Sequence, residues 1–291
     1  MSTVPPRLSD ARAAASLPGI SVAVIELLRS IGAAEATATE ISDALSRDLT
    51  LTARVLKVVN SAYYGQSRTI ASVERAVVVL GFPAVRSIAM AAGCFRLRRM
   101  GGSVGGVTPE ALLSHGLAVA LASRHLARTR QGLCREEAFM AGLLHDFGLL
   151  LEMHGSPADF ATLAADMPIG EAATPSSWLA METALFGAAH GERAAGVFAE
   201  WQLPERIVGA IACHHAPLTA EDPLRELAAV VALADSLAAD AELGFAGASE
   251  PVTPDDAVLE YLAFDWSERT DLQDSVRNEM GSLQGILADG A

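Results

Sequence analysis

Apolar residues recur every three to four positions along most of this chain, which is the spacing of amphipathic helices. No stretch of useful length alternates apolar and polar residues as a half-buried strand would. We therefore predict an all-α fold. In the first hundred residues the pattern predicts helices at about 17–32, from about 39, from 48–50 to 60–61, at 72–80 and at 83–96.

A glycine-rich stretch, Gly101-Gly102-Ser103-Val104-Gly105-Gly106, interrupts the pattern and is the clearest linker in the sequence. Beyond it, helices are expected at about 110–129, 135–153, 177–189, 191–201, 204–214, 223–240 and 270–288, with a further helix capped at 253–256. Residues 167–177 and 244–251 are expected to be loops. The prediction is a two-lobed protein: a mobile leader (1–16), an N-terminal helical lobe (17–100), the linker (101–107), a helical bundle (108–240) and a C-terminal helical extension (241–291). The extension is expected either to dock on the second lobe or to form an oligomer contact.

One predicted helix carries a histidine and an acid within a run that is apolar on every side. His145 and Asp146 follow Gly142-Leu143-Leu144 and precede Phe147-Gly148-Leu149-Leu150. A helix of this composition is expected to be buried all round. A buried carboxylate without a partner costs several kcal/mol, so it is normally paired, protonated or bound to a metal. Asp146 therefore requires a partner from elsewhere in the chain.

Other polar residues also lie on apolar helix faces, and they are the candidate partners. They are His115, His190, His214, His215 and Asp235. Imidazole and carboxylate ligands on a helical bundle suit Zn, Fe, Mn or Ni, as one ion or two. The alternative is that these residues are hydrogen-bonded in pairs as part of the core. The spacing of the residues does not decide between a metal site and core packing.

Composition and charge narrow the function classes. The chain has 291 residues and a formal charge of −14, which argues against direct binding of nucleic acid. Cys94, Cys134 and Cys213 are far apart and odd in number, so we expect a reducing, cytoplasmic location. The N-terminus has no signal-peptide pattern, and no apolar run approaches the roughly 20 residues that span a bilayer, so no membrane association is expected.

Two sets of motifs, one in each half, resemble a known family. The first half contains Asp48-Leu49-Thr50, Asn60-Ser61-Ala62-Tyr63-Tyr64-Gly65, Ala76 and Leu80-Gly81. The second half contains Leu143-Leu144-His145-Asp146-Phe147-Gly148, His190, Trp201, Leu203-Pro204, His214-His215 and Ala234-Asp235. Over about residues 17–240 the chain resembles the HDOD (HD-related output domain) family of bacterial signalling proteins, within the HD superfamily of metal-dependent phosphohydrolases.

The resemblance implies a role for each polar residue of the second half. By similarity to the HD pattern, His115, His145, Asp146 and Asp235 would hold a first metal ion. His190, His214 and His215 correspond to the histidines that complete a second ion site in the related HD-GYP phosphodiesterases. The HD-like helical lobe is therefore expected to contain an unusually complete set of ligands.

The residues that would bind a phosphate substrate depart from the catalytic pattern. Where HD-GYP enzymes carry a lysine three residues after the HD aspartate, this chain has Leu149, and Ala216-Pro217-Leu218 replaces their Gly-Tyr-Pro signature. Lys57 is the only lysine, and Arg193 is the nearest arginine after residue 138. We therefore assign no catalytic residue and expect, as for HDOD proteins generally, a regulatory protein that binds a signalling protein partner. A homo-oligomer is the other assembly that we consider.

Two hypotheses follow from these observations. The first is a signalling module that acts through protein contacts, with Asn60, Tyr63 and Tyr64 as a candidate interaction surface; the alternative for the tyrosines is that they join the two lobes. The second is a metal-dependent phosphohydrolase that acts on a nucleotide or a cyclic dinucleotide.

Overall fold

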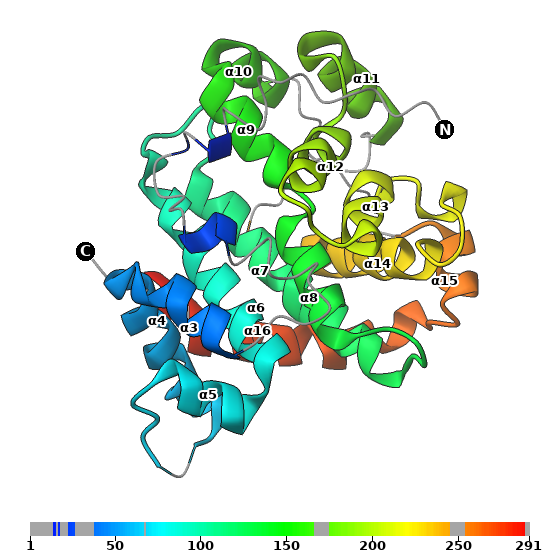
Figure 1. Ribbon diagram of the computed structural model, residues 1–291. Helices are drawn as coiled ribbons and strands as arrows, with labels where there is room; N and C mark the ends of the chain where they lie inside the picture. The colour runs from blue at the N-terminus through cyan, green and yellow to red at the C-terminus, as the bar shows by residue number, and fades with distance from the viewer. Residues whose placement is uncertain are drawn as a thin grey trace.

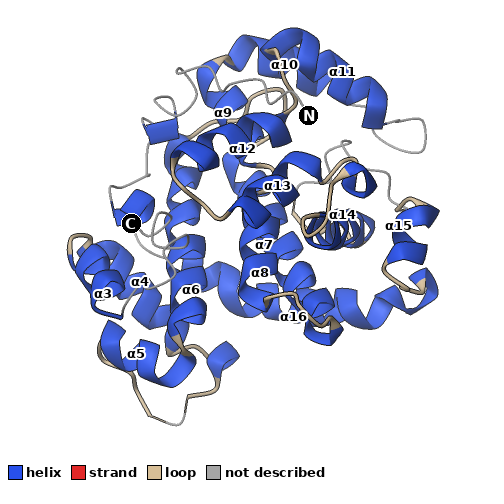
Figure 2. Ribbon diagram, turned by 45° about the vertical axis from the view of Figure 1, so that its right-hand side comes forward, coloured by secondary structure: helices blue, strands red, loops and turns tan. Residues whose placement is uncertain are grey.

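Every regular element of the computed structural model is a helix (Figures 1 and 2). The structure describes residues 14–15, 17, 23–26, 38–66, 68–165, 175–244 and 254–288. Across these ranges it contains no β-strand; a single antiparallel bridge pairs Val104 with Val107. The predicted all-α fold is confirmed. Within the described ranges, none of the helices combines the length and the apolar character that crossing a bilayer requires.

Two of the N-terminal helices, α4 (Leu49–Val59) and α5 (Val73–Leu80), begin at side-chain caps that the sequence predicts. Helix α3 (Ala38–Ser46) precedes them and α6 (Phe82–Cys94) follows them. The carboxylate of Asp48 accepts a hydrogen bond from the Leu51 amide, and the Ser72 hydroxyl accepts one from Arg75. Pro83 lies in the first turn of α6, where its missing N–H is not needed. The predicted leader and most of the predicted helix at 17–32 lie outside the described residues.

The second half contains a bundle of helices around α7. They are α7 (Pro109–Leu126), α8 (Arg135–Leu144), α9 (Phe147–Gly155), α10 (Pro157–Ala165), α11 (Pro175–Phe186), α12 (His190–Glu200), α13 (Glu205–Cys213) and α14 (Arg225–Asp240). Helix α10 was not predicted. Of the predicted loop at 167–177, residues 175–177 are helical and the rest lies outside the described residues.

The predicted single helix at 135–153 is wrong, because the chain breaks at His145 and Asp146. The His145 imidazole donates from Nδ1 to the Gly142 carbonyl at 2.7 Å, and Asp146 has φ −96° and ψ 12°, outside the α-helical region. In a continuous helix the Gly142 carbonyl would accept from the Asp146 amide. The histidine side chain therefore competes with the helix at this point, and the HD pair lies at a helix junction.

The C-terminal residues form α15 (Asp256–Tyr261) and α16 (Arg269–Ala288). Helix α16 packs against both α7 and α4, so it joins the two halves of the chain (Figure 1). At this junction the Glu279 carboxylate accepts from the Tyr63 hydroxyl at 2.9 Å and lies 3.2 Å from Arg124 and 2.7 Å from His125. Of the two predicted roles for the extension, docking within the chain is the one the structure shows. The predicted loop at 244–251 lies outside the described residues from 245 onward.

Two glycines allow the helices that carry the HD motif to cross closely. A Cβ on Gly148 would lie 2.1 Å from the carbonyl oxygen of His190, and one on Gly191 would lie 2.7 Å from that of Ile211. Real Cβ atoms do not approach backbone this closely. A side chain at Gly148 would therefore push α9 away from α12, and one at Gly191 would push α12 away from α13. These crossings set the distances among the histidines.

We expect Gly148→Ala to destabilise the protein by about 2–4 kcal/mol, because the added methyl group meets backbone that cannot rotate away. Gly155→Ala, on the same helix, is the matched control, because a Cβ there has open space. Urea unfolding of both variants at pH 7 measures the effect. Equal stability of the two variants would contradict the close crossing of α9 and α12.

Candidate metal centre

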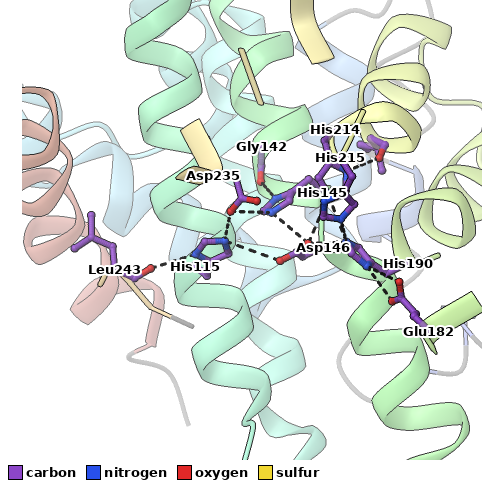
Figure 3. A network of polar contacts seen from close by, with 11 residues as sticks. His115, Gly142, His145, Asp146, Glu182, His190, His214, His215, Asp235 and Leu243 are labelled. Carbon is purple, nitrogen blue, oxygen red and sulfur yellow. Dashed lines mark hydrogen bonds and ion pairs between the residues drawn. The ribbon is translucent and has the colours of Figure 1, made fainter. Parts of the chain in front are cut away.

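All seven residues that the sequence singled out come together at one place (Figure 3). His115 lies in α7, Asp235 in the middle of α14, and His145 and Asp146 at the α8–α9 junction. His190 is the first residue of α12, and His214 and His215 follow α13. All of them except His215 are at most 7% exposed. Residues separated by as many as 120 positions thus converge in a buried cluster.

Asp146 occupies the centre of this cluster. Its Oδ1 atom lies 3.2 Å from His145 Nε2 and 3.1 Å from His190 Nε2. Its Oδ2 atom lies 4.0 Å from His115 Nε2, which in turn is 2.6 Å from Asp235 Oδ1. The carboxylate therefore lies between one group of possible ligands, His115 and His145, and a second group on α12 and α13.

The second group consists of His190, His214 and His215. His190 Nε2 lies 3.3 Å from His214 Nε2 and 2.8 Å from His215 Nε2. Two neutral imidazoles cannot satisfy each other through facing lone pairs, so one nitrogen must carry a proton or all must share a cation. The two groups separately meet the geometry of a site in which three ligand atoms surround one ion.

The outer nitrogens of four histidines are held by acceptors. Nδ1 of His145 donates to the Gly142 carbonyl and Nδ1 of His214 to the Ile211 carbonyl, each at 2.7 Å. Nδ1 of His115 lies 3.3 Å from the Leu243 carbonyl, and Nδ1 of His190 lies 2.9 Å from a Glu182 oxygen. A carbonyl only accepts, so the hydrogen of neutral His145 and His214 is on Nδ1 and the Nε2 lone pair is directed inward, as in metal-ligating histidines. In the chain alone, His115 instead donates from Nε2 to the Asp235 carboxylate at 2.6 Å.

The donor set fits a divalent transition-metal ion. His145 Nε2 and Asp146 Oδ1 are buried, and neither makes a hydrogen bond of acceptable geometry. Such atoms are costly in a protein interior unless something else satisfies them. Ligands about 2.0–2.1 Å from a tetrahedral ion are about 3.4 Å apart, close to the observed separations of 3.1–3.3 Å. Imidazole and carboxylate ligands fit Fe, Zn, Mn or Ni.

The histidines of the cluster divide into three whose imidazole pKa is raised and two whose imidazole pKa is lowered. Burial opposes protonation of His145, but the adjacent Asp146 carboxylate overcomes it and raises the imidazole pKa to about 9. The pKa values of His115 and His190 are likewise raised against burial by Asp235 and Glu182 respectively. Burial, reinforced by the neighbouring His190, lowers the pKa of His215 to about 3, and burial with the neighbouring His215 lowers that of His214. In the chain alone, protons on imidazoles neutralise the buried carboxylates.

The sequence analysis missed two buried acids behind the centre. Glu182 on α11 is fully buried and lies 2.9 and 3.1 Å from His190 Nδ1 through its two oxygens. Glu152 on α9 is 1% exposed; burial and the Glu182 charge raise its carboxyl pKa well above the usual range. Glu182 follows Leu179-Ala180-Met181, so an acid in an apolar helix was the available signal.

Arg193, on the helix that begins with His190, is engaged by one of these acids. Arg193 Nη1 lies 3.4 Å from Glu152 Oε1, the guanidinium lies over the Phe186 ring, and the side chain is 14% exposed. Leu149, three residues after Asp146, is fully buried. Arg193 is therefore directed at a buried acid rather than presented to solvent.

Of the candidate interaction residues, Asn60 and Tyr63 use their polar groups within the chain, and Tyr64 packs partly buried against Tyr63. The Asn60 side chain exchanges hydrogen bonds with the Ile70 backbone, and Tyr63 binds Glu279 as described above. Burial, together with Glu136 and Glu279, raises the pKa of the Tyr64 hydroxyl. This geometry favours the alternative that the tyrosines join the lobes; their role as an interaction surface stays a prediction.

Comparison with known proteins gives consistent matches. The sequence profile of the HDOD domain matches residues 17–217, a range that ends before Asp235. A structure of an HDOD domain protein of unknown function from Geobacter sulfurreducens is 25% identical, with TM-score 0.71, over 96% of this chain and 98% of that one. A candidate phosphohydrolase from Shewanella amazonensis SB2B is 26% identical, with TM-score 0.70, over 97% and 98% of the two chains.

One curated relative is much longer than this chain. It is an uncharacterized protein of Treponema pallidum, 24% identical over 220 residues, which are 75% of this chain and 41% of that protein. The chain thus spans about two-fifths of the length of the curated relative that it matches. The match adds no information on activity or partners.

We expect the affinity for Zn²⁺ to rise with pH. A ligating imidazole must be neutral, whereas His145 keeps its proton up to a pKa of about 9. Between about pH 6.5 and 8.5, affinity should rise by up to about tenfold per unit for each proton displaced. Competition with a chromogenic chelator, corrected for its own titration, measures this slope. His125→Gln, outside the cluster, should not change it, and a flat profile would exclude His145 as a ligand.

Glu182→Gln should weaken Zn²⁺ binding by about 10–100-fold, because the amide removes the charge that holds His190 in place. Glu192→Gln is the matched control: it makes the same change of charge at an exposed position of α12. Both variants are compared by the same chelator competition and by thermal melting. An unchanged affinity in Glu182→Gln, with unchanged melting, would show that Glu182 does not position a ligand.

Proposed function

Because this chain belongs to the HDOD domain family, we propose that it is a regulatory protein of bacterial signal transduction, and that it acts by contacting a protein partner. In this proposal its buried His and Asp centre holds one or two divalent transition-metal ions that stabilise the fold and turn over no substrate. A cytoplasmic location is part of the proposal and is supported by three cysteines that all remain free thiols.

The observation that carries the proposal is the contrast between the ligands and their surroundings. The possible ligands converge completely, yet six of the seven are at most 7% exposed. A phosphoester also needs cationic or amide donors beside the metal. Of the described residues around the centre, Arg193 is bound to Glu152, and Leu149 contributes only apolar packing. The site is suited to holding a cation more than to holding an anionic substrate.

The geometry supports a ligand role for each residue in this proposal. His115, His145 and Asp146, with Asp235 beside His115, would hold one ion, and His190, His214 and His215, with Asp146 between the groups, would hold another. A bound ion supplies positive charge to the carboxylates and lowers the pKa of a bound water. Glu182 and the Gly142 and Ile211 carbonyls orient the imidazoles without touching the ion.

The second candidate function is a metal-dependent phosphohydrolase acting on a nucleotide or a cyclic dinucleotide. It is favoured by the completeness of the ligand set and by the similarity to the candidate phosphohydrolase of Shewanella amazonensis. It requires an opening to the buried centre and a cation that becomes available to bind phosphate.

The two functions are separated by measuring metal and turnover in the same preparation. We expect near-stoichiometric metal by elemental analysis and a fall in melting temperature on chelation, because an ion that binds only the folded state stabilises it. We expect no hydrolysis of cyclic di-GMP, guanosine tetraphosphate or common nucleotides above that of Asp146→Ala.

Metal-dependent hydrolysis that Asp146→Ala abolishes would overturn the regulatory proposal in favour of the enzyme. Asp159→Ala, which removes an exposed acid on α10, controls for nonspecific effects of losing a carboxylate. If the protein contains no metal and chelation leaves its melting temperature unchanged, the cluster is hydrogen-bonded packing alone.

A further inference from the structure

The charges of this chain are distributed very unevenly. Residues 1–100 contain 12 of the 21 Lys and Arg residues but only 7 of the 35 Asp and Glu residues. Their net charge is +5, whereas residues 101–291 carry −19. The overall charge of −14 therefore hides a basic N-terminal part, and a basic part attracts acidic partners at a distance.

Within this basic part, helix α5 leaves an apolar face uncovered. Its sequence, Ala76-Val77-Val78-Val79-Leu80, is apolar all round its last turns, as for a helix buried on every side. Only one side is covered, by Val73 and Ala76 turned inward. Val78 is 73% exposed and Val79 40% exposed, and both are among the few large apolar residues at the described surface. Valine is a weak helix former, so propensity does not explain two exposed valines here.

Cations border this face, and the adjacent acid is already engaged. Arg75 is exposed and lies three and four positions before Val78 and Val79, so it shares their side of the helix. Arg68 is exposed in the segment that leads into α5. Glu74 is hydrogen-bonded to the Ser42 hydroxyl. Helix α5 lies at the end of the molecule opposite α10 and α11, away from the metal centre (Figure 1).

We propose that the face formed by Val78, Val79, Arg75 and Arg68, the α5 face, binds an acidic amphipathic helix of a partner protein. The partner's apolar stripe covers the valines, and its carboxylates lie near the two arginines, the arrangement in which a helix packs into an apolar groove with a charged rim. This assignment rests on the proposed function, because it names the chemistry of the partner.

A second copy of the chain fits this face less well. A symmetric dimer through α5 would place one basic part, with net charge +5, directly against another. Like charges across an interface oppose association. In the other candidate surface, the Tyr63 hydroxyl is already hydrogen-bonded to Glu279 within the chain, and Tyr64 is only partly exposed. An acidic partner satisfies both the valines and the arginines.

The test uses the full-length protein and two designed 16-residue helical peptides that share a leucine stripe and differ in flanking Glu or Lys. Fluorescence anisotropy is measured at about 50 and 300 mM salt, across which screening of surface charge strengthens. We expect the Glu peptide to bind and the Lys peptide not to bind. The double variant Val78→Ser, Val79→Ser should weaken binding at least tenfold, and Arg75→Glu should weaken it at least threefold and reduce its salt dependence.

Two exposed positions in the acidic part serve as matched controls. Tyr261→Ser removes a large side chain that is 41% exposed. Arg277→Glu reverses the charge at a position whose side chain is 52% exposed. Neither should change peptide affinity. Because the substituted side chains at α5 are exposed, we expect unchanged melting temperatures, and Arg75→Glu tests the face independently of the double variant.

Several results would overturn the assignment. They are failure of the Glu peptide to bind, equal binding of both peptides, and affinity that is insensitive to the α5 substitutions. Self-association in sedimentation that Val78→Ser, Val79→Ser abolishes would instead identify a second copy as the occupant. Binding of anionic vesicles or duplex DNA through the same residues would overturn the assignment in favour of those surfaces. If the peptide does not bind and the protein hydrolyses no nucleotide, only the assignment of the α5 face is refuted. If the protein shows metal-dependent hydrolysis, the regulatory proposal itself is refuted.

Discussion

Three carboxylates buried at one point need positive charge, and much of this structure is arranged to supply it. Asp146, Asp235 and Glu182 are 7%, 3% and 0% exposed. Uncompensated charges at such depth would cost more than a marginally stable domain can lose. Imidazoles from α7, the α8–α9 junction, α12 and the end of α13 surround the carboxylates. Protons on these imidazoles supply the required charge in the chain alone, and a metal ion held by the same atoms would supply it instead and would couple its binding to folding.

That requirement explains several features that would otherwise look like defects. The break between α8 and α9 places His145 and Asp146 where their side chains can point inward from a junction. The same local device, an imidazole that donates to the carbonyl three residues earlier, ends α13 at His214. Glycines at the crossings of α9, α12 and α13 let the backbones approach until the ligand atoms are about 3 Å apart. Glu152 and Arg193 then close the buried network on its outer side.

Away from the buried centre, the contacts of α16 determine which surfaces are covered and which are exposed. Helix α16 bridges α7 and α4, and its Glu279 gathers Tyr63, Arg124 and His125 at the junction of the two halves. This leaves the tyrosine turn occupied internally and the valines of α5 uncovered on the basic part of the chain. Under the two proposals, the buried centre holds positive charge and the remote α5 face contacts a partner, a separation that is compatible with regulation.

The sequence by itself determined the features that depend on residues close together along the chain, such as the starts of helices. Capping residues such as Asp48 and Ser72 mark helix starts because their hydrogen bonds span only three residues. It also determined which polar residues need partners, since an acid in an apolar helix is costly in any fold. It did not predict the junction at Asp146, helix α10 or the role of Glu182, and it left the docking of the C-terminal extension as one of two alternatives. Those depend on which helices pack together and how closely. Convergence of His115 with Asp235, 120 residues apart, is a product of long-range packing, which no local spacing encodes, so only the tertiary structure decided it.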